Sequence, residues 1–342
     1  MHEVGRLGLS PAGHPPAVAV VGVPVVDMVA HVERFPIPGG HSAGSSLDVA
    51  PGGPAINVAT GAARLGHPSI LLGKIGADPL GDLLASALRE ESVTLPEGFV
   101  VSGSPTAVVL VLYDGNGRGE MRSFSFRQGS ADGQLAEADM EPALLAGARA
   151  LFLDGVLAFA DALTAAGLRA AEIARSSGCR VFMDPNVRIP GNALPPDQAA
   201  RMAALLAVSD EVLLNEREVF WISGMPPGGS GRPPVEAVIE RLAGAYPLVA
   251  CWTVKLGVEG CMVFAGGEVF SQPAFPTNVC DTSGAGDSFD AAWIAAFLEG
   301  RGRRDAARFA SATASLTVAG KGAWRSLPRR SAVDAMLAER GM

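Results

Sequence analysis

The sequence predicts an α/β fold: a central, mostly parallel sheet flanked by helices, with a small β-sheet lid. From about residue 149, short apolar runs alternate with helix-forming runs, a pattern typical of a parallel sheet with helices on both faces. Earlier, segments 31–50 and 107–126 change character and predict a small sheet apart from the main body. A glycine-rich stretch at 281–289, which leads into an apolar helix-forming run, supplies a candidate site.

The composition favours one large domain without a nucleic-acid or membrane partner. With 48% hydrophobic and 18% charged residues, a chain of 342 residues can bury a sizeable core, and its net charge of −8 disfavours anionic partners. The apolar run 17–26 is short, broken by Gly22 and Pro24, and lacks a basic leader, so it predicts a strand rather than a signal peptide. The four cysteines form no C-x-x-C pair, so we expect reduced thiols in a cytoplasmic protein.

Domain boundaries follow from these changes of pattern. We expect a loose tail over 1–16, an α/β domain over 17–328, and a C-terminal helix or tail over 329–342. The loop 226–234 is rich in glycine and proline and has no assigned purpose.

The first half of the domain predicts two strands and two helices. A buried strand over 17–26 ends in Asp27, and a second strand covers 69–75. A helix over 55–65 has Pro54 in its first turn and Gly66 just beyond its end, which are favoured positions for these residues. Another helix covers 81–89.

The lid is predicted from a hairpin pattern. Strands over 107–113 and 120–126 flank a turn at 114–117, and together with 31–50 they can form a separate sheet. The exposed edge of such a sheet invites pairing with another chain, so we expect a homodimer.

The second half predicts strands that each end in a polar residue. The strands cover 150–153, 180–183, 211–214 and 248–254, with helices at about 160–176 and 197–207. In open α/β sheets, ligands bind outside the carboxyl ends of the strands. We therefore expect one site formed by the polar residues that follow the strands: Asp27, Asp154, Asp184, Asn215 and Lys255.

The glycine-rich stretch predicts an anion site beside a base. Gly284, Ala285 and Gly286 predict a tight loop that opens onto a helix over 288–298. Backbone N–H groups at a helix N-terminus attract anions, and Asp287 at the mouth can accept a proton. Phosphoryl transfer to a hydroxyl needs this combination. The alternative is a glycine-rich turn with Asp287 as a helix cap, and this stretch alone favours neither.

Several motifs together resemble a known family. The 281–289 stretch resembles the C-terminal signature of the PfkB-type carbohydrate kinases, which have the ribokinase-like fold. The family's other motifs are matched in order over about 17–328, at 52–59, 73–81, 184–188, 215–218 and 254–260.

The resemblance implies roles for individual residues. Asp287 would be the base, and the backbone of Gly284, Ala285 and Gly286 would hold the transferring phosphate. Asp27, Gly53 and Asn57 would bind the sugar.

The same resemblance implies nucleotide and metal sites. ATP would lie along Lys255, Gly257, Gly260, Gly322, Asn186 and Arg188. Asn215 and Glu218 would hold magnesium through its waters. Asp281 and Ser283 match positions that hold a monovalent cation such as potassium in ribokinase-like proteins.

The leading hypothesis is an ATP-dependent kinase that phosphorylates a hydroxymethyl group of a small sugar or sugar derivative by in-line transfer. One alternative is a nucleoside kinase of the same fold, which would need an aromatic wall in the lid. The lid is poor in aromatic residues near Asp27, where Phe35 and Tyr113 are the main candidates for such a wall, so a sugar is favoured. The other alternative is an inactive sugar-binding protein, against which the intact 284–287 stretch argues. A Walker loop and a strand-coupled G-x-G-x-x-G motif are both absent.

Overall fold

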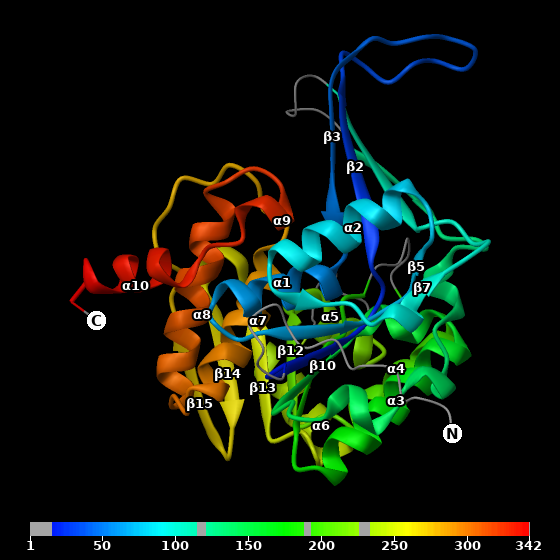
Figure 1. Cartoon of the computed structure of the whole chain (residues 1–342). Helices are drawn as coiled ribbons and strands as arrows, with labels where there is room; N and C mark the ends of the chain where they lie inside the picture. Colours follow the sequence, from blue (N-terminus) through cyan, green and yellow to red (C-terminus); the bar gives the residue numbers. More distant parts are fainter. Residues whose placement is uncertain (1–15, 115–120, 188–192, 226–232, 342) are drawn as a thin grey trace.

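A nine-stranded sheet forms the centre of the molecule (Figure 1). The structure is a computed structural model that describes residues 16–114, 121–187, 193–225 and 233–341. The strand order is β15-β14-β13-β12-β11-β10-β1-β4-β6, and only the pairings of β14 and β15 are antiparallel. The strands are β1 (Val18–Val21), β4 (Ser69–Leu72), β6 (Val93–Thr94), β10 (Ala150–Asp154), β11 (Arg180–Asp184), β12 (Glu211–Asn215), β13 (Cys251–Lys255), β14 (Cys261–Ala265) and β15 (Glu268–Gln272).

The chain builds this sheet outward from its middle. It runs from β1 to β4 and β6 on one side, then returns to β10 beside β1 and continues the other way through β11, β12 and β13. The strand order therefore reverses between β1 and β10. In doubly wound sheets, the carboxyl ends of the strands at such a reversal form the ligand crevice.

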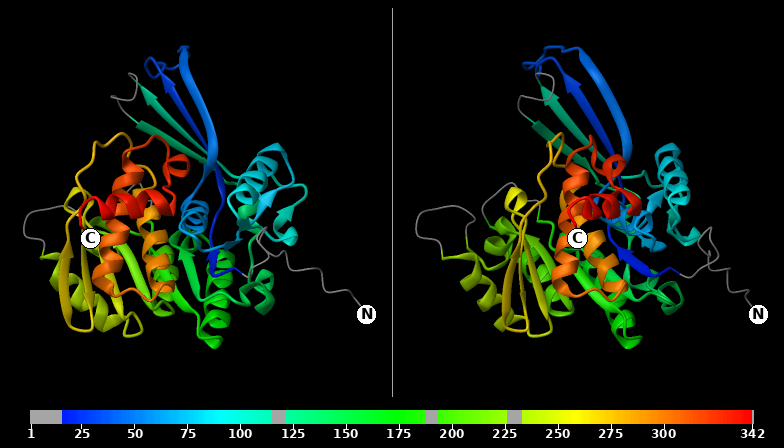
Figure 2. Two further views of the ribbon diagram at one scale, coloured as in Figure 1. Left: turned by 60° about the vertical axis from the view of Figure 1, so that its left-hand side comes forward. Right: turned by 90° about the vertical axis from the view of Figure 1, so that its left-hand side faces the viewer.

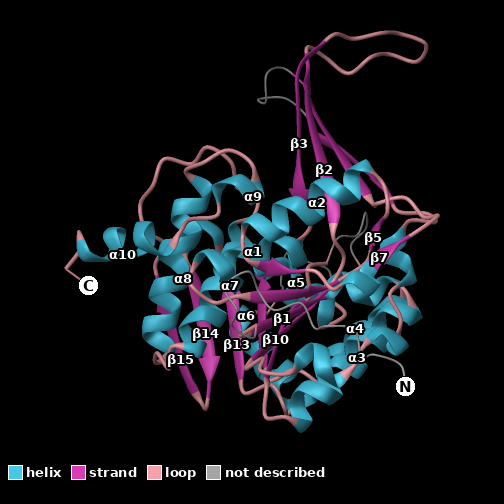
Figure 3. Cartoon of the chain, in the orientation of Figure 1, coloured by secondary structure: helices cyan, strands magenta, loops and turns pink. Residues whose placement is uncertain are grey.

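Helices cover both faces of the sheet (Figure 3). Alternate residues of β1 point to opposite faces, so Val18 and Val20 join one buried cluster while Ala19 and Val21 join the other. On the Val18 face lie α1 (Pro54–Arg64), α2 (Pro79–Glu90), α7 (Ala285–Leu298), α8 (Arg303–Val318) and α10 (Arg330–Ala338). The other face carries α3 (Asp161–Ser176), α4 (Pro196–Ala207), α5 (Glu216–Ile222) and α6 (Val235–Ala245).

A four-stranded sheet, which we call the small sheet, projects from this body (Figure 2). Its order is β3-β2-β8-β9, formed by β2 (Val25–Val32), β3 (Gly44–Gly52), β8 (Val108–Asp114) and β9 (Met121–Phe126). Its strands include residues of both predicted lid segments, 31–50 and 107–126, and also residues 25 and 26, which were predicted to belong to a strand of the main body. Residues 115–117 of the predicted hairpin turn lie outside the described residues. A further pair, β5 (Ile75–Gly76) and β7 (Val100–Val101), lies apart from both sheets.

The prediction of one strand over 17–26 is wrong. The extended run is interrupted at residues 22–24, so that β1 lies in the main sheet and β2 in the small sheet. Gly22 has no room for a side chain, because a Cβ there would lie 2.6 Å from the Cβ of Asp154. Asp27 is therefore the third residue of β2, paired with Ala50 and Val109, and does not follow a strand of the main sheet.

The predicted strand over 69–75 is also split, into β4 and β5. A Cβ on Gly73 would lie 2.3 Å from the carbonyl oxygen of Gly22, so the two points at which the predicted strands are interrupted pack against each other. The other strand predictions hold to within a few residues, and the polar residues Asp154, Asp184, Asn215 and Lys255 do end β10, β11, β12 and β13.

Helix boundaries differ from the predictions mainly at the N-termini. The helix predicted over 81–89 begins at Pro79, because Asp78 caps it by accepting a hydrogen bond from the Gly81 backbone N–H at 2.8 Å. The helix predicted over 288–298 begins at Ala285, so Asp287 lies in its first turn. The 226–232 part of the unassigned loop lies outside the described residues. No described helix combines the length and the apolar composition that crossing a membrane requires.

Candidate active site

The predicted anion loop is the start of α7. Gly284 caps this helix in the left-handed conformation with φ +75°, and a Cβ there would lie 2.9 Å from the Cα of Ala323. Both constraints require glycine at this position. The first turn of an α-helix has backbone N–H groups without intrahelical acceptors, and the helix dipole adds partial positive charge there. The N-terminus of α7 is therefore suited to bind an anion.

Asp287 lies in this first turn and contacts a residue from the opposite end of the sequence. Its Oδ2 accepts a hydrogen bond of 2.7 Å from Nδ2 of Asn57 in α1. Both side chains are buried, with 9% of Asp287 and 3% of Asn57 exposed. Gly53 caps α1 at φ +88°. The fold therefore brings the predicted base together with a predicted sugar-binding residue.

Asp27 lies at the same end of α1. Its carboxylate occupies the space above Gly52, where a Cβ would lie 2.2 Å from Cγ of Asp27. Gly52 ends β3 and directly precedes Gly53. The three predicted sugar-binding residues, Asp27, Gly53 and Asn57, are thus held together by the turn from β3 into α1.

Asp281 ties the segment before α7 to the segment after α8. Its two carboxylate oxygens accept backbone N–H groups of Ser283 at 2.9 Å and Gly322 at 2.8 Å. Burial raises the pKa of this carboxyl, but these hydrogen bonds outweigh burial and lower it below its usual value. The arrangement brings a predicted nucleotide-binding residue, Gly322, against the predicted cation residues Asp281 and Ser283.

Lys255 at the end of β13 is held between two carboxylates. Its Nζ donates to Oδ2 of Asp184 at 2.7 Å and to Oδ1 of Asp290 at 2.9 Å. A Cβ on Gly286 would lie 3.4 Å from the same Nζ, so the ammonium lies directly beside the first turn of α7.

Asp290 is the residue of this cluster that sequence reasoning missed. It is 0% exposed and lies three residues after Asp287, within an otherwise apolar stretch of α7. A carboxylate in a buried helix needs a partner, and this signal could have directed attention to it. Neighbouring Trp293 is also buried, and its Nε1 donates to Oε2 of Glu211 at 2.8 Å.

The charges in the cluster depend on one another. Burial raises the pKa of Asp290 well above its usual value despite the nearby ammonium. Burial acts in the same sense on Asp184, but the charge of Lys255 prevails and lowers its pKa. The two carboxyl groups also share a hydrogen bond. A proton on Asp290, an ionised Asp184 and a charged Lys255 therefore make a neutral set.

Asn215 and Glu218 form a capping box at the start of α5. Oδ1 of Asn215 accepts from the Glu218 backbone N–H at 3.1 Å, and Oε2 of Glu218 accepts from the Asn215 backbone N–H at 2.8 Å. Oε1 of Glu218 also accepts from the Val187 backbone N–H at 2.9 Å. Burial, followed by the charge of Asp184, raises the pKa of Glu218 to about 8. This glutamate thus joins α5 to the chain that follows β11.

We expect this raised pKa to make stability fall as the pH rises. The unfolded carboxyl loses its proton near pH 4.3, whereas the folded one keeps it until about pH 8, so between these values the folded state binds the extra proton. Each pH unit in this window corresponds to at most about 1.4 kcal/mol. Glu218→Gln stays neutral and should flatten the slope in urea unfolding between pH 5 and 9. An equal slope in both proteins would contradict this expectation.

The remaining predicted nucleotide residues lie in two turns. Gly257 and Gly260 form the turn from β13 to β14, with φ +60° and +96°, and a Cβ on Gly260 would lie 2.0 Å from the Gln272 carbonyl oxygen. Asn186 follows β11, and its backbone N–H donates to Oδ1 of Asp184 at 2.9 Å. Arg188 lies outside the described residues.

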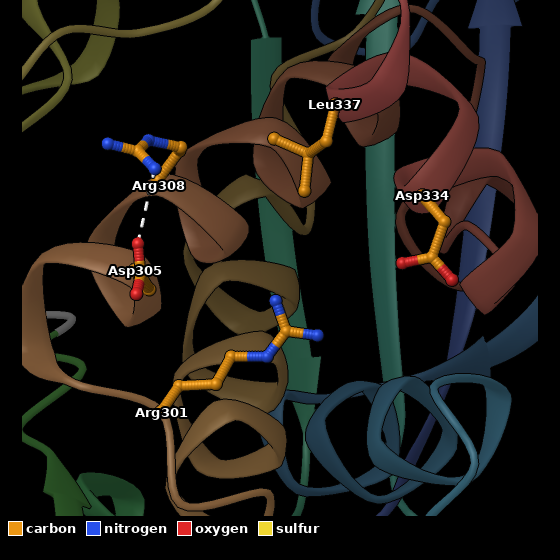
Figure 4. A pocket seen from close by; sticks show the side chains of 5 residues that line it. All are labelled: Arg301, Asp305, Arg308, Asp334 and Leu337. Carbon is orange, nitrogen blue, oxygen red and sulfur yellow. Dashed lines mark hydrogen bonds and ion pairs between the residues drawn. The ribbon is translucent and has the colours of Figure 1, made fainter. Parts of the chain in front are cut away.

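A cavity of about 370 Å³ between α8 and α10 contains none of these residues (Figure 4). Its lining residues are Arg301, Asp305, Arg308, Asp334 and Leu337. The charged side chains pair locally: Arg308 with Asp305 at 3.1 Å, and Asp334 with Arg330 at 2.8 Å. The chemistry-bearing residues converge instead where α1, α7 and the carboxyl ends of β11 and β13 meet.

Comparison with known proteins identifies the family of the chain. The family model for pfkB family carbohydrate kinases matches residues 16–330. Fructokinase-1 of Oryza sativa subsp. japonica is 32% identical over 292 residues, which cover 82% of this chain and 85% of that protein. The ribokinase of Arabidopsis thaliana is 29% identical over 331 residues, which cover 95% of this chain and 82% of that protein.

Solved structures show the same fold. The Arabidopsis thaliana ribokinase, solved with ribose and ATP, aligns with a TM-score of 0.76 and 28% identity over 95% of this chain and 99% of that one. A putative ribokinase II from E. coli, solved with ATP and Mg²⁺, aligns with a TM-score of 0.81 and 22% identity over 95% and 99%. The predicted ribokinase-like fold is confirmed, and the chain belongs to the pfkB family of carbohydrate kinases.

Proposed function

We propose that the chain transfers the γ-phosphate of ATP to a hydroxymethyl group of a small sugar or sugar derivative. One observation carries the proposal: Asp287 is buried in the first turn of α7, beside the anion-binding N-terminus, and is hydrogen-bonded to Asn57 of the turn-and-helix segment that also holds Asp27 and Gly53. A base, an anion cradle and a polyol site therefore share one location, which is what transfer between a phosphate and a hydroxyl requires.

In the proposed reaction, Asp287 accepts the proton of the sugar hydroxyl as its oxygen bonds to the γ-phosphorus. The bond between that phosphorus and the bridging oxygen of ATP breaks, and ADP leaves. The N–H groups at the start of α7 stabilise the charge on the transferring phosphoryl group. Lys255 lies beside that turn and adds positive charge there.

Magnesium fits this site through its waters. Both oxygens of Glu218 and Oδ1 of Asn215 already accept backbone N–H groups, so direct ligation by this pair is disfavoured. Mg²⁺ usually keeps several waters and binds substrate phosphates, and Asn215 and Glu218 would hold those waters. When bound, the ion neutralises charge on the phosphates. The monovalent cation at Asp281 and Ser283 stays a prediction.

The relatives narrow the choice of substrate to test first. Those compared above are named fructokinase and ribokinase, so fructose and ribose lead the panel. A turnover assay with ATP and magnesium should detect ADP only when a matching sugar is present, and EDTA should stop it. Turnover with a nucleoside as acceptor but with no sugar would favour the nucleoside kinase alternative. Sugar binding without turnover would favour the inactive sugar-binding protein.

Asp27→Asn should weaken sugar binding much more than ATP binding. A carboxylate that accepts hydrogen bonds from hydroxyls contributes roughly 1.5–3 kcal/mol, which corresponds to a loss of about tenfold to a hundredfold in affinity. Isothermal titration with the best sugar and with ATP measures both effects. Equal losses for the two ligands would mean that Asp27 supports the fold of the site instead of binding the sugar.

The small sheet is proposed to act as a lid over the sugar and to pair with a second copy. Paired residues share a face of a sheet, so Asp27 lies on one face, and Leu47, Phe124 and Phe126 lie on the other. These three apolar side chains are 63%, 47% and 59% exposed in the single chain. A second copy would cover them.

We expect a homodimer by light scattering at micromolar concentration. Phe124→Lys should give a monomer, because it places a charge within the apolar face of the small sheet. Ser123→Lys is the matched control, since Ser123 is the neighbouring residue of β9 and points to the opposite face. A monomeric wild-type protein would exclude the shared sheet.

A further inference from the structure

Helices α1 and α7 pack closely through two matched pairs of residues, Gly61 with Ala291 and Asn57 with Asp287. A Cβ on Gly61 of α1 would lie 2.7 Å from the Cβ of Ala291 of α7, so the helices meet where one has no side chain. Asn57 precedes Gly61 by four residues, and Asp287 precedes Ala291 by four. Residues four apart lie on the same helix face. The close approach at Gly61 therefore also sets the separation of Asn57 from Asp287.

Asn57 has two polar atoms with different surroundings. Its Nδ2 donates to Oδ2 of Asp287 at 2.7 Å. Its Oδ1 is buried and has no hydrogen-bond partner among the residues that the structure describes. A buried acceptor of this kind is costly unless a ligand satisfies it. One amide group can thus contact the base with its nitrogen and a substrate hydroxyl with its oxygen.

We propose that Asn57 is a positioning residue for Asp287 as well as a sugar ligand, and that the Gly61–Ala291 contact maintains this bond. This inference rests on the proposed function. The amide N–H orients the Asp287 carboxylate and favours its ionised form, which is the form that accepts a proton. Sugar binding at Oδ1 and the orientation of the base are then coupled through a single side chain.

The two roles of Asn57 can be separated by two substitutions. Asn57→Asp keeps an acceptor for the sugar but places a second carboxylate against Asp287, and two adjacent carboxylates resist double ionisation. In Asn57→Asp, the acid limb of the kcat–pH profile should move to higher pH by about one unit or more. Asn57→Leu removes both functions, so it should raise the sugar KM and also lower kcat by about tenfold to a hundredfold.

Gly61→Ala tests the bond without altering either polar side chain. The added methyl group must push α1 away from α7, which lengthens the contact between Asn57 and Asp287. We expect a lower kcat and an acid limb of the kcat–pH profile that is displaced to higher pH, because the ionised form of Asp287 loses its donor. The KM for ATP should be nearly unchanged. Gly244→Ala is the matched control, because Gly244 also lies within a helix, α6, and a Cβ there meets nothing within 4 Å. This control should behave as wild type.

Carbon-13 NMR of the aspartate carboxyl groups gives a readout that does not depend on turnover or on Gly61→Ala folding. The resonance of Asp287 is identified by its loss in Asp287→Asn. The inference predicts that this resonance titrates at higher pH in Asn57→Asp than in wild type. Coincident titrations, with an acid limb that also matches wild type and only the sugar KM changed, would overturn it. A wild-type protein that phosphorylates nothing in the panel would reject the proposed function, while the titration still decides whether Asn57 positions Asp287.

Discussion

Asp287→Asn is expected to lower kcat by about 10²–10⁴-fold while both substrates still bind. A sugar hydroxyl has a very high pKa, so it attacks slowly unless its proton has an acceptor. The asparagine keeps the shape of the side chain and the start of α7 but cannot take the proton. Steady-state kinetics with the best sugar, together with equilibrium binding of ATP and sugar, measure the effect.

The control for this experiment is Asp305→Asn. Asp305 also occupies the first turn of a long helix, α8, so its replacement removes the same interaction with a helix dipole. It lies outside the candidate site and should leave kcat unchanged. A loss confined to KM in Asp287→Asn would indicate uniform binding without a role in the transition state. Unchanged turnover would refute the proposed mechanism.

Lys255→Met is expected to destabilise the protein by about 3–5 kcal/mol at neutral pH, the usual cost of removing one partner from a buried ion pair. Without the ammonium, Asp184 and Asp290 remain buried next to each other and lack a positive partner within the cluster. Protonation of Asp184 then becomes the main means of neutralising the cluster, so the loss of stability should shrink as the pH falls. Urea unfolding at pH 5 and pH 8 measures both effects.

Two variants decide whether the buried cluster causes this loss. Lys255→Met combined with Asp184→Asn should recover part of the stability, because the carboxylate that Lys255 neutralises is then replaced by a neutral amide. Lys74→Met removes an ammonium that pairs at 2.7 Å with Asp139, which is closer to solvent than Asp290, and should cost less than about 1 kcal/mol. An equal cost for Lys255→Met and Lys74→Met would mean that burial of the cluster is unimportant.

Local patterns were sufficient to predict much of the fold. The strands β10 to β13 were found from short apolar runs that each end in a polar residue, because both burial and termination are written in consecutive residues. Helix α1 was predicted between Pro54 and Gly66 for the same reason, since helix ends depend on the residues at the ends themselves. The family motifs are likewise short segments.

The failures occurred where distant segments decide the structure. The run over 17–26 is apolar apart from Gly22 and Pro24 and was predicted as one strand, yet it splits because Gly22 packs against Asp154 and Gly73, which lie far along the sequence. The helical pattern of the sequence assigns no partner to Asp290, whose role follows only from its neighbours Lys255 and Asp184 in the structure. Such partners come from other elements, and sequence periodicity carries no information about them.

By itself, the sequence determined helix α1, the motifs, and the strands β10 to β13 with the polar residues that end them, because these depend on neighbouring residues and on the alternation of apolar and polar positions. Only the tertiary structure decided that Asn57 holds Asp287 and that Lys255 is enclosed by two carboxylates. Those contacts depend on the packing distance between α1 and α7 and on the order of strands in the sheet. Both are set by the fit of side chains across elements that are up to 230 residues apart.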